Sequence, residues 1–298
     1  MKRIAVTGAT GLIGRHLVAA LRARGDSVVA LSRHAQQVAD LDTTVWDPSG
    51  EALPASARDD VDAIVNLAGT GIGDGRWSPT HRRQIIDSRV DTTRRVVTAL
   101  GDGGPTTLIN ASAVGFYGPS DDALDEDAPA GHDFLAEVCT SWEQEAQLGA
   151  DRARVVRLRT GVVLATDGGA LPRLLLPTRL GLGGPLGGGH QWMSWIHIED
   201  QINAILHCLE DSTIAGAVNA TAPHAVRQRE FARVLGRVLH RPAFLPTPGF
   251  PARLLLGAAA DIALTGQQVV PGVLTKTGFA FRFTDLEPAL RDLLTDGH

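Results

Sequence analysis

Length, composition and charge describe an ordinary globular chain. It has 298 residues, of which 44% are hydrophobic and 20% charged, with a net charge of −5 and a pI of about 6.0. One large α/β unit, or a large unit with a smaller appendage, can bury a core at this length. The negative balance argues against nucleic-acid and membrane partners, because both need a basic field. We expect a small-molecule partner.

Cysteine content and hydropathy bear on the compartment. Only Cys139 and Cys208 are present, which is too few for a disulfide framework, and they lack metal-ligand spacing, so no metal site is expected. No signal segment opens the chain, because strand residues begin at position 3. We therefore expect a cytoplasmic protein. Its oligomeric state is left open.

The first stretch predicts a buried strand that runs through a glycine-rich turn into a helix. An apolar run at 4–6 precedes Gly8, Gly11 and Gly14, and apolar residues then recur at helical intervals. A helix N-terminus offers unpaired N–H groups, and glycines let a pyrophosphate approach the backbone. The turn therefore predicts a dinucleotide site, and a turn without a ligand is the alternative. The expected binding residues are Gly8, Thr10, Gly11, Leu12, Ile13 and Gly14.

The string TGATGLIG at 7–14 departs from the GxGxxG fingerprint by one extra residue. In this form and at this position it resembles the short-chain dehydrogenase/reductase superfamily, and within it the extended, epimerase-like members. That resemblance implies a nicotinamide dinucleotide as the cofactor.

The end of the second strand, predicted at 27–31, indicates which dinucleotide. An NAD site would place an acidic residue about 20 residues beyond the glycines, whereas Arg33 follows Gly14 by 19 residues, next to Ser32. A guanidinium and a hydroxyl can bind a 2′-phosphate, which an acid would repel. NADP is therefore expected, and a solvated arginine at a strand end is the alternative.

Further strands at 43–46 and 62–67 complete a βαβ pattern, which predicts a Rossmann-type doubly wound parallel sheet with the ligand at the carboxyl ends of its strands. By the resemblance, Asp47 lies near the adenine, and Leu67, Ala68 and Gly69 line the adenosine side of the site. Trp77, in a glycine-rich loop at 70–78, either faces the substrate or anchors the loop. A helix follows from Pro79 to about Leu100 and carries Ser88 and Arg89.

The fifth strand, 106–111, delivers Ser112. In classical members of the resembled superfamily this serine acts with a Tyr-x-x-x-Lys pair. The single tyrosine here, Tyr117, has no lysine four residues later, and Cys139 and Glu143 occupy the slot of the pair. Ser112, Cys139 and Glu143 are therefore the candidate catalytic residues, with Ser112 expected to polarise a substrate carbonyl.

The roles of Cys139 and Glu143, which stand at the Tyr-x-x-x-Lys position, remain open. Four residues apart on a helix, Cys139 and Glu143 share a face. The carboxylate raises the thiol pKa, so a thiolate nucleophile is not expected. Cys139 is either a weak donor or an inert core residue, and Glu143 could accept hydrogen bonds from a ribose.

The later segments extend the resemblance over essentially the whole chain. A sixth strand at 154–158, a glycine-rich stretch at 181–189 that is a lid or only a loop, and a helix entered at 194–200 precede a strand at 217–221 and a helix at 227–239. His197 is expected to be structural rather than catalytic. The tail from Val269 resembles the C-terminal module of an uncharacterised epimerase-like family of atypical short-chain dehydrogenases/reductases.

Together these features predict a domain at 1–220, with a substrate-side excursion at about 160–195, and a smaller region at 221–298. The expected function is that of an NADP-binding oxidoreductase or epimerase-like enzyme on a small molecule, with sugar nucleotides among the candidates. The alternative is a sensor that binds NADPH without turnover.

Overall fold

A computed structural model describes residues 1–72, 77–101, 103–243 and 264–295. Its centre is a parallel sheet in the order β13-β9-β7-β6-β1-β2-β5. The order changes direction between β1 and β6, which is the switch point of a doubly wound sheet. The strands are β1 (Arg3–Thr7), β2 (Ser27–Ser32), β5 (Thr44–Val45), β6 (Ala63–Asn66), β7 (Thr107–Ala113), β9 (Arg154–Thr160) and β13 (Gly216–Ala220).

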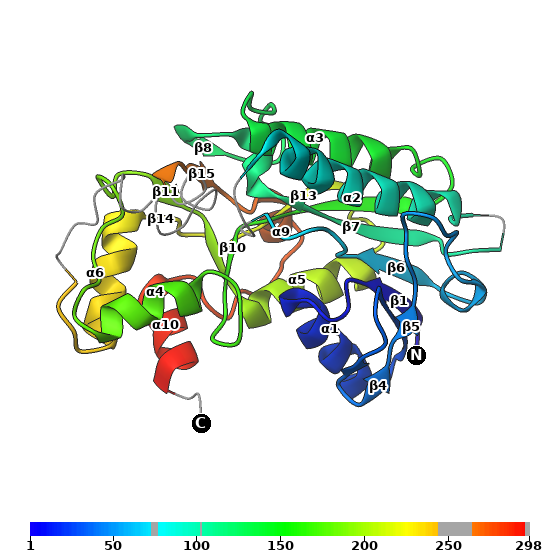
Figure 1. Ribbon diagram of the computed structural model, residues 1–298, viewed down its shortest axis with the longest axis horizontal. Helices are drawn as coiled ribbons and strands as arrows, with labels where there is room; N and C mark the ends of the chain where they lie inside the picture. Colours follow the sequence, from blue (N-terminus) through cyan, green and yellow to red (C-terminus); the bar gives the residue numbers. More distant parts are fainter. Residues whose placement is uncertain (73–76, 102, 244–263, 296–298) are drawn as a thin grey trace.

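Helices cover both faces of this sheet (Figure 1). In β1, Ile4 and Val6 pack into the core cluster that holds the α1 residue Leu17, whereas Ala5 joins the cluster of Val96 from α2. This division follows from the period of two along a strand. The covering helices are α1 (Leu12–Ala23) and α5 (Ile198–Glu210) on one face, and α2 (Pro79–Thr98) and α3 (Phe134–Gln147) on the other.

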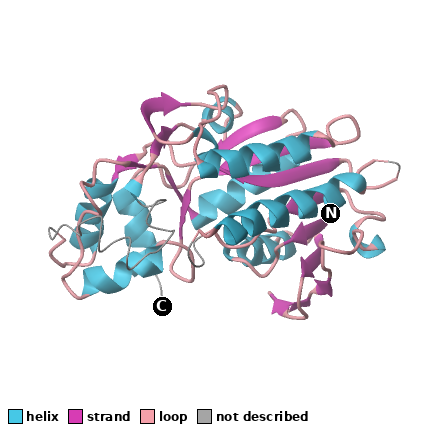
Figure 2. Cartoon of the chain, turned by 45° about the horizontal axis from the view of Figure 1, so that its top comes forward, coloured by secondary structure: helices cyan, strands magenta, loops and turns pink. Residues whose placement is uncertain are grey.

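A smaller, helix-rich part lies at one end of the molecule (Figures 1 and 2). Its core cluster joins Leu171, Phe231 and Leu290 from three helices. The helices are α4 (Leu171–Arg179), α6 (Gln228–Val238) and α10 (Leu286–Thr295). Three strand pairs border it: β10 (Val162–Leu164) with β12 (Trp195–His197), β11 (Trp192–Met193) with β14 (Val226–Arg227), and β8 (Ser120–Leu124) with β15 (Gln267–Val269).

The last described residues return to the main core. Leu274, on α9 (Gly272–Lys276), is fully buried in the same cluster as the β13 residue Val218. The Asp200 carboxylate accepts the backbone N–H groups of Arg282 and Phe283, each at 2.9 Å. The C-terminal segment is therefore held against α5 by buried contacts.

The predicted fold class is confirmed, and the structure differs from expectation in local detail. The third strand is shorter than 43–46, since β5 covers only Thr44–Val45 at the sheet edge. A hairpin of β3 (Gln37–Val38) and β4 (Leu41–Asp42) precedes it and was not expected. Its turn places Ala39 and Asp40 at φ of 48° and 57°. Alanine is an unusual residue for such a turn, so the sequence carries no hairpin signal there.

Candidate cofactor and substrate site

The three glycines of the turn at 8–14 differ in what a side chain would meet. Gly8 has φ of 64°, and a Cβ there would lie 2.8 Å from the Leu67 oxygen. A Cβ on Gly14 would lie 2.2 Å from the Gly8 oxygen. Gly11 has φ of −71°, and its Cβ would meet only the Gly8 oxygen, at 3.3 Å. Packing therefore requires glycine at positions 8 and 14. At position 11 glycine is required only if a ligand binds against the backbone there.

The start of α1 offers that approach to an anion. Gly11 is the N-cap, no side chain caps the helix, and its first turn holds no acidic residue. Gly11 is exposed, and Thr10, Leu12 and Ile13 are half-buried around it. Asp167 is near the start of α1 but is paired with Arg15 and His16, so the unpaired N–H groups favour a phosphate at this point. The turn therefore fits the pyrophosphate of a dinucleotide.

Ser32 and Arg33, predicted to select NADP over NAD, lie at the carboxyl end of β2. Asp47, predicted to lie near the adenine, follows the carboxyl end of β5, and the two strands are paired. Hydrogen bonds within the turn at Ser49, and more weakly the charge of Arg33, lower the pKa of the Asp47 carboxyl. Arg33 is exposed and, within the described ranges, makes no hydrogen bond or ion pair. Ser32 is half-buried beside it. Arg33 and Ser32 are thus available to an anionic group at this edge.

The buried hydroxyl of Thr7, which was not predicted as a site residue, shapes the next part of the site. Thr7 Oγ1 donates to Asn66 Oδ1 at 2.6 Å and accepts the N–H groups of Leu67 and Ala68 at 3.2 and 3.3 Å. These bonds fix the chain as it leaves β6 and lead it to Gly69, which is exposed. Thr7 could have been predicted as a site residue, because it is a polar residue at the end of an otherwise apolar strand.

The three candidate catalytic residues come together, but not as expected. Ser112 Oγ donates to Glu143 Oε1 at 2.7 Å, and Arg159 donates to both Glu143 oxygens at 2.8 and 2.9 Å. Ser112, Glu143 and Arg159 are 4%, 2% and 4% exposed. With its oxygens engaged in this way, Glu143 is poorly placed to receive a ribose. The hydroxyl of Ser112 likewise points to Glu143 rather than to a substrate.

Arg159 extends these contacts into what we call the Glu143 network. Its Nη1 donates to Tyr117 Oη at 2.9 Å, and Tyr117 donates to Asn219 Oδ1 at 2.7 Å. The guanidinium also lies 3.5 Å from the centre of the Phe116 ring. The network consists of Ser112, Glu143, Arg159, Tyr117 and Asn219. Arg159 was not predicted, although a charged residue in a buried strand signals a buried partner.

Cys139 is the candidate catalytic residue that lines a cavity. Burial, with the Glu143 charge as a second cause, raises the pKa of its thiol to about 12. The nearby Ala113 amide, the charge of Arg89 and the Ser112 hydroxyl lower this pKa and offset the rise only in part. The thiol is therefore protonated at neutral pH, as expected from the sequence, and can act as a donor but not as a nucleophile.

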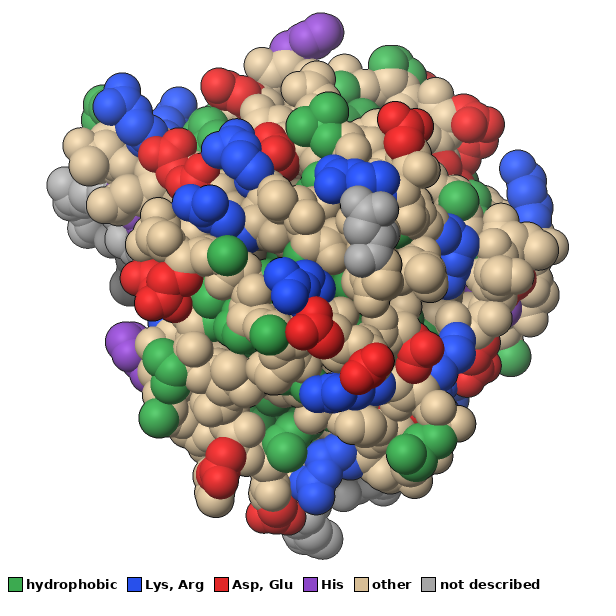
Figure 3. Space-filling view, turned by 90° about the vertical axis from the view of Figure 1, so that its right-hand side faces the viewer, with side chains coloured by type: hydrophobic (Ala, Val, Ile, Leu, Met, Phe, Trp, Pro, Cys, Tyr) green, Lys and Arg blue, Asp and Glu red, His purple; other side chains and the backbone are tan. Residues whose placement is uncertain are grey.

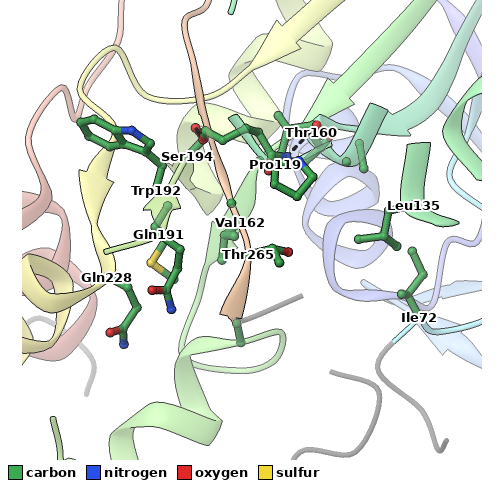
Figure 4. A pocket seen from close by; sticks show the side chains of 18 of the residues that line it. Ile72, Pro119, Leu135, Thr160, Val162, Gln191, Trp192, Ser194, Gln228 and Thr265 are labelled. Atoms are coloured by element: carbon green, nitrogen blue, oxygen red, sulfur yellow. Dashed lines mark hydrogen bonds between the residues drawn. The ribbon is translucent and has the colours of Figure 1, made fainter. Parts of the chain in front are cut away.

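That cavity measures about 490 Å³ and lies between the ends of β7 and β9 and the smaller, helix-rich part. Figure 4 shows Ile72 and Leu135 on one side of it and Trp192 and Gln228 on the other. Ser112 is not among the described residues that line it. Its wall is largely apolar, with Ala113, Leu135, Cys139, Val162, Trp192 and Met193 among the lining residues.

The cavity adjoins the glycine turn. Gly169 lines the cavity, and a Cβ on it would lie 3.1 Å from a methyl carbon of Leu12. Cys139 lines the same cavity. The glycine turn and the thiol thus border one continuous part of the candidate site.

The contacts of Trp77, whose role was open, and of His197, which was expected to be structural, indicate what each residue does. Trp77 donates to the Ile72 oxygen at 2.9 Å and packs on Phe134 at 5.0 Å between ring centroids, so it anchors its loop. The neighbouring Arg76 lies outside the described residues. His197 is 1% exposed and accepts the Glu199 N–H at 3.2 Å as the N-cap of α5. Burial lowers the pKa of His197 to about 4, which suits a neutral cap.

The surface and the helices set limits on partners. On the face in Figure 3, basic and acidic side chains are interspersed and form no field of one sign. Among the described helices, none has the length and apolar character needed to cross a bilayer.

The sheet order, the uncapped glycine turn and the adjoining cavity define a doubly wound α/β protein of the extended short-chain dehydrogenase/reductase type. Residues 4–220 match the model of the NAD dependent epimerase/dehydratase family, and residues 247–293 match a domain of unknown function, DUF1731. The chain belongs to the NAD dependent epimerase/dehydratase family. The resemblance in the glycine turn and the tail is confirmed.

Several relatives cover the whole chain. The chloroplastic SDR39U1 homolog of Arabidopsis thaliana is 40% identical over 98% of this chain and 86% of its own. The crystal structure of human SDR39U1 isoform 2 with NADPH is 37% identical, covers 99% of both chains and superposes with a TM-score of 0.90. A nucleoside-diphosphate sugar epimerase of Corynebacterium glutamicum is 33% identical with a TM-score of 0.81, over 98% of this chain and 58% of its own.

Proposed function

We propose that this protein is an NADPH-dependent oxidoreductase or epimerase-like enzyme that acts on a small molecule in the 490 Å³ cavity. The observation that carries the proposal is the open position at Gly11, whose backbone suits any residue and whose missing side chain leaves the start of α1 accessible. The human relative crystallised with NADPH supports the choice of cofactor.

The cofactor-binding roles follow from the positions of the residues. The N–H groups at the start of α1, around Gly11, hold the pyrophosphate. Arg33 and Ser32 bind the 2′-phosphate, because a free guanidinium with a hydroxyl beside it matches that group. Asp47 lies on the adenine side, and the 67–69 segment lines the adenosine half of the site.

NADPH, when bound, supplies a hydride to the substrate. We assign the donor role at the substrate oxygen to Cys139, whose protonated thiol lines the cavity. Ser112 and Glu143 act through it as positioning residues, since Ser112 contacts the sulfur and Glu143 holds Ser112. This assignment replaces the expected carbonyl contact of Ser112.

The cavity chemistry bears on the substrate. Its apolar wall favours a compact carbonyl compound, and the exposed Arg173 is available at its edge for one anionic group. A sugar nucleotide is the other candidate, supported by the C. glutamicum relative. A nucleoside diphosphate carries several charged and polar groups, which an apolar wall serves poorly.

A second candidate function is a sensor that binds NADPH without turnover. The observation in its favour is the raised pKa of Cys139, because a thiol that gives up its proton only at about pH 12 is a weak acid catalyst. In this case the glycine-rich stretch at 181–189, which contributes Leu186 to the cavity wall, would respond to the cofactor.

The deciding experiment combines binding and turnover. NADPH affinity is measured by titration, and NADPH oxidation is then followed with a panel of apolar carbonyl compounds and of sugar nucleotides, for the wild type and for Cys139→Ala. Turnover that falls in the variant while affinity stays constant supports the enzyme. Binding without turnover on the whole panel, with NADPH-dependent protection of 181–189 from protease, supports the sensor. Absence of NADPH binding contradicts both.

A further inference from the structure

Gln228, at the start of α6, carries a side-chain amide that the proposed function leaves unused. The residue is 5% exposed and lines the cavity. Its Oε1 accepts the backbone N–H of Leu186 at 2.8 Å, and its own backbone N–H donates to the Gln191 oxygen at 2.9 Å. Among the described residues, Nε2 has no hydrogen-bond partner. A buried donor without a partner costs free energy, so this amide favours a ligand that accepts a hydrogen bond.

The contact with Leu186 decides which end of the Gln228 amide a ligand can meet. A backbone N–H needs an acceptor, so Oε1 faces Leu186 and the NH2 group is the end that remains. Leu186 is itself held, because Gln191 Nε2 and the Gly189 N–H donate to its oxygen at 3.2 and 3.0 Å. The amide therefore cannot turn over without losing the bond to a fixed part of the chain, and it presents a donor to the cavity.

A second N–H group at this end of the cavity also lacks an acceptor. Trp192 lies on the same side of the cavity as Gln228 (Figure 4). Its Nε1 is buried and, within the described ranges, has no hydrogen-bond partner. Two donors without acceptors at one end of an otherwise apolar cavity indicate a ligand that carries an oxygen acceptor there.

The Gln228 end of the cavity lies away from the thiol. A Cβ on Gly115 would lie 3.2 Å from the Cβ of Leu135 and 3.9 Å from the sulfur of Cys139, so the thiol is on the Leu135 side. Leu135 and Gln228 lie on opposite sides of the cavity, and Val162 adds an apolar side chain to the wall between them (Figure 4). A ligand that contacts both ends needs an oxygen function at each and an apolar spacer.

We propose that Gln228 selects substrates that carry a second, uncharged oxygen acceptor, separated by an apolar spacer from the carbonyl at Cys139. This inference rests on the proposed enzyme function and narrows its substrate to bifunctional compounds such as keto esters and diketones. The acceptor is uncharged because a buried neutral amide does not compensate an anion. A carboxylate would instead bind the exposed Arg173 at the cavity edge.

The test compares two probes of equal chain length, an alkan-2-one and the matching methyl keto ester, over a range of lengths. Each is titrated into the NADPH-saturated protein. The wild type is expected to bind the keto ester about 5- to 10-fold more tightly, which corresponds to one neutral hydrogen bond. Gln228→Glu keeps an acceptor for the Leu186 N–H and removes the donor, so at neutral pH this preference is expected to be lost.

A second variant separates the donor from the charge that Gln228→Glu introduces. Gln228→Met has a similar volume and neither a donor nor a charge, and it is also expected to lose the preference. The matched control is Gln144→Glu, which makes the same change at an exposed position of α3 and is expected to keep the preference. Because the readout is a ratio of two affinities in one protein, a general loss of stability does not imitate the effect.

The outcomes that overturn the inference differ from those that overturn the proposed function. Equal affinity of the wild type for both probes, or binding of neither while NADPH binds, would contradict the role of Gln228. A preference that survives in either Gln228 variant would place the donor elsewhere. A keto acid that binds more tightly than the keto ester would assign the second oxygen to Arg173. A wild type that binds no NADPH would overturn the proposed function itself, before any probe is added.

Discussion

The two halves of the candidate site are built in different ways. At the cofactor end, the glycine turn presents backbone N–H groups. Its shape depends on the side chains that are absent at Gly8 and Gly14, and access to it depends on the one absent at Gly11. At the reaction end, buried side chains carry the structure, with Glu143 held by Arg159 and Ser112. A backbone site tolerates changes around it, whereas a network of buried charges fails when one member is removed. The two ends should therefore respond differently to substitution.

The largest effect is expected at Gly11. Gly11→Val should abolish NADPH binding, because the branched side chain fills the space at the start of α1 while the backbone conformation remains allowed. Isothermal titration checks the loss, and circular dichroism checks that the protein is folded. The matched variant Gly14→Ala should instead destabilise the fold, since its Cβ would meet Gly8 at 2.2 Å. Wild-type affinity in Gly11→Val would mean that the cofactor does not bind there.

Next in size is the loss of Arg159. Arg159→Leu removes the cation that holds both Glu143 oxygens and leaves, among the described residues, only the more distant Arg157, whose Nη1 lies 3.5 Å from Oε2. The variant should cost about 3 kcal/mol of unfolding free energy. The control is Arg94→Leu, which breaks the partly exposed pair with Glu145 and should cost less than about 1 kcal/mol. Urea unfolding measures both. Equal costs for the two variants would contradict the contrast between the ends of the site.

Arg33 tests cofactor choice at the cofactor end. Arg33→Asp should weaken NADPH by on the order of 100-fold and make NADH the tighter ligand, because an acid repels the 2′-phosphate. Fluorescence titration with both nucleotides measures the change, with the exposed Arg22→Asp as the control. If the wild type binds NADPH and NADH equally, Arg33 has no such role.

A smaller effect is expected for the reaction-side thiol. Cys139→Ala should lower kcat by about 10-fold, since one hydrogen-bond donor is lost at the substrate oxygen. Ser112→Ala should lower it less, and Cys139→Ser should largely retain it. Steady-state kinetics with an accepted substrate measures all three. A larger loss in Ser112→Ala than in Cys139→Ala would restore the role first expected for Ser112.

The smallest effect concerns pH. The Cys139 thiol has a folded pKa of about 12, against about 8.5 in an unfolded chain, so the unfolded state loses its proton first as pH rises. The associated stability is present below pH 8.5 and declines above it, by about 1 kcal/mol at pH 9.5. Urea unfolding at pH 7.5 and 9.5 should show a smaller decline for Cys139→Ala than for the wild type. Identical declines would mean that this thiol titrates normally.

The strand, turn and helix at the cofactor end could be predicted from the sequence because their signals are local. The strand, turn and helix at 3–23 are contiguous, and Arg33 follows at a fixed spacing. The reaction end depends on residues far apart in the chain: Tyr117 and Asn219 are 102 positions apart. A strand spacing places Ser112 at the site but does not reveal that its hydroxyl turns toward Glu143.

The return of the C-terminal segment to the core has a consequence for synthesis. Leu274 fills the cluster under β13, and β15 pairs with β8 across nearly 150 residues. A ribosome releases the glycine turn early, yet the residues that close the core are among the last to emerge. The nascent chain must therefore carry an open apolar surface until β15 and Leu274 have been synthesised, and it is prone to association during that time.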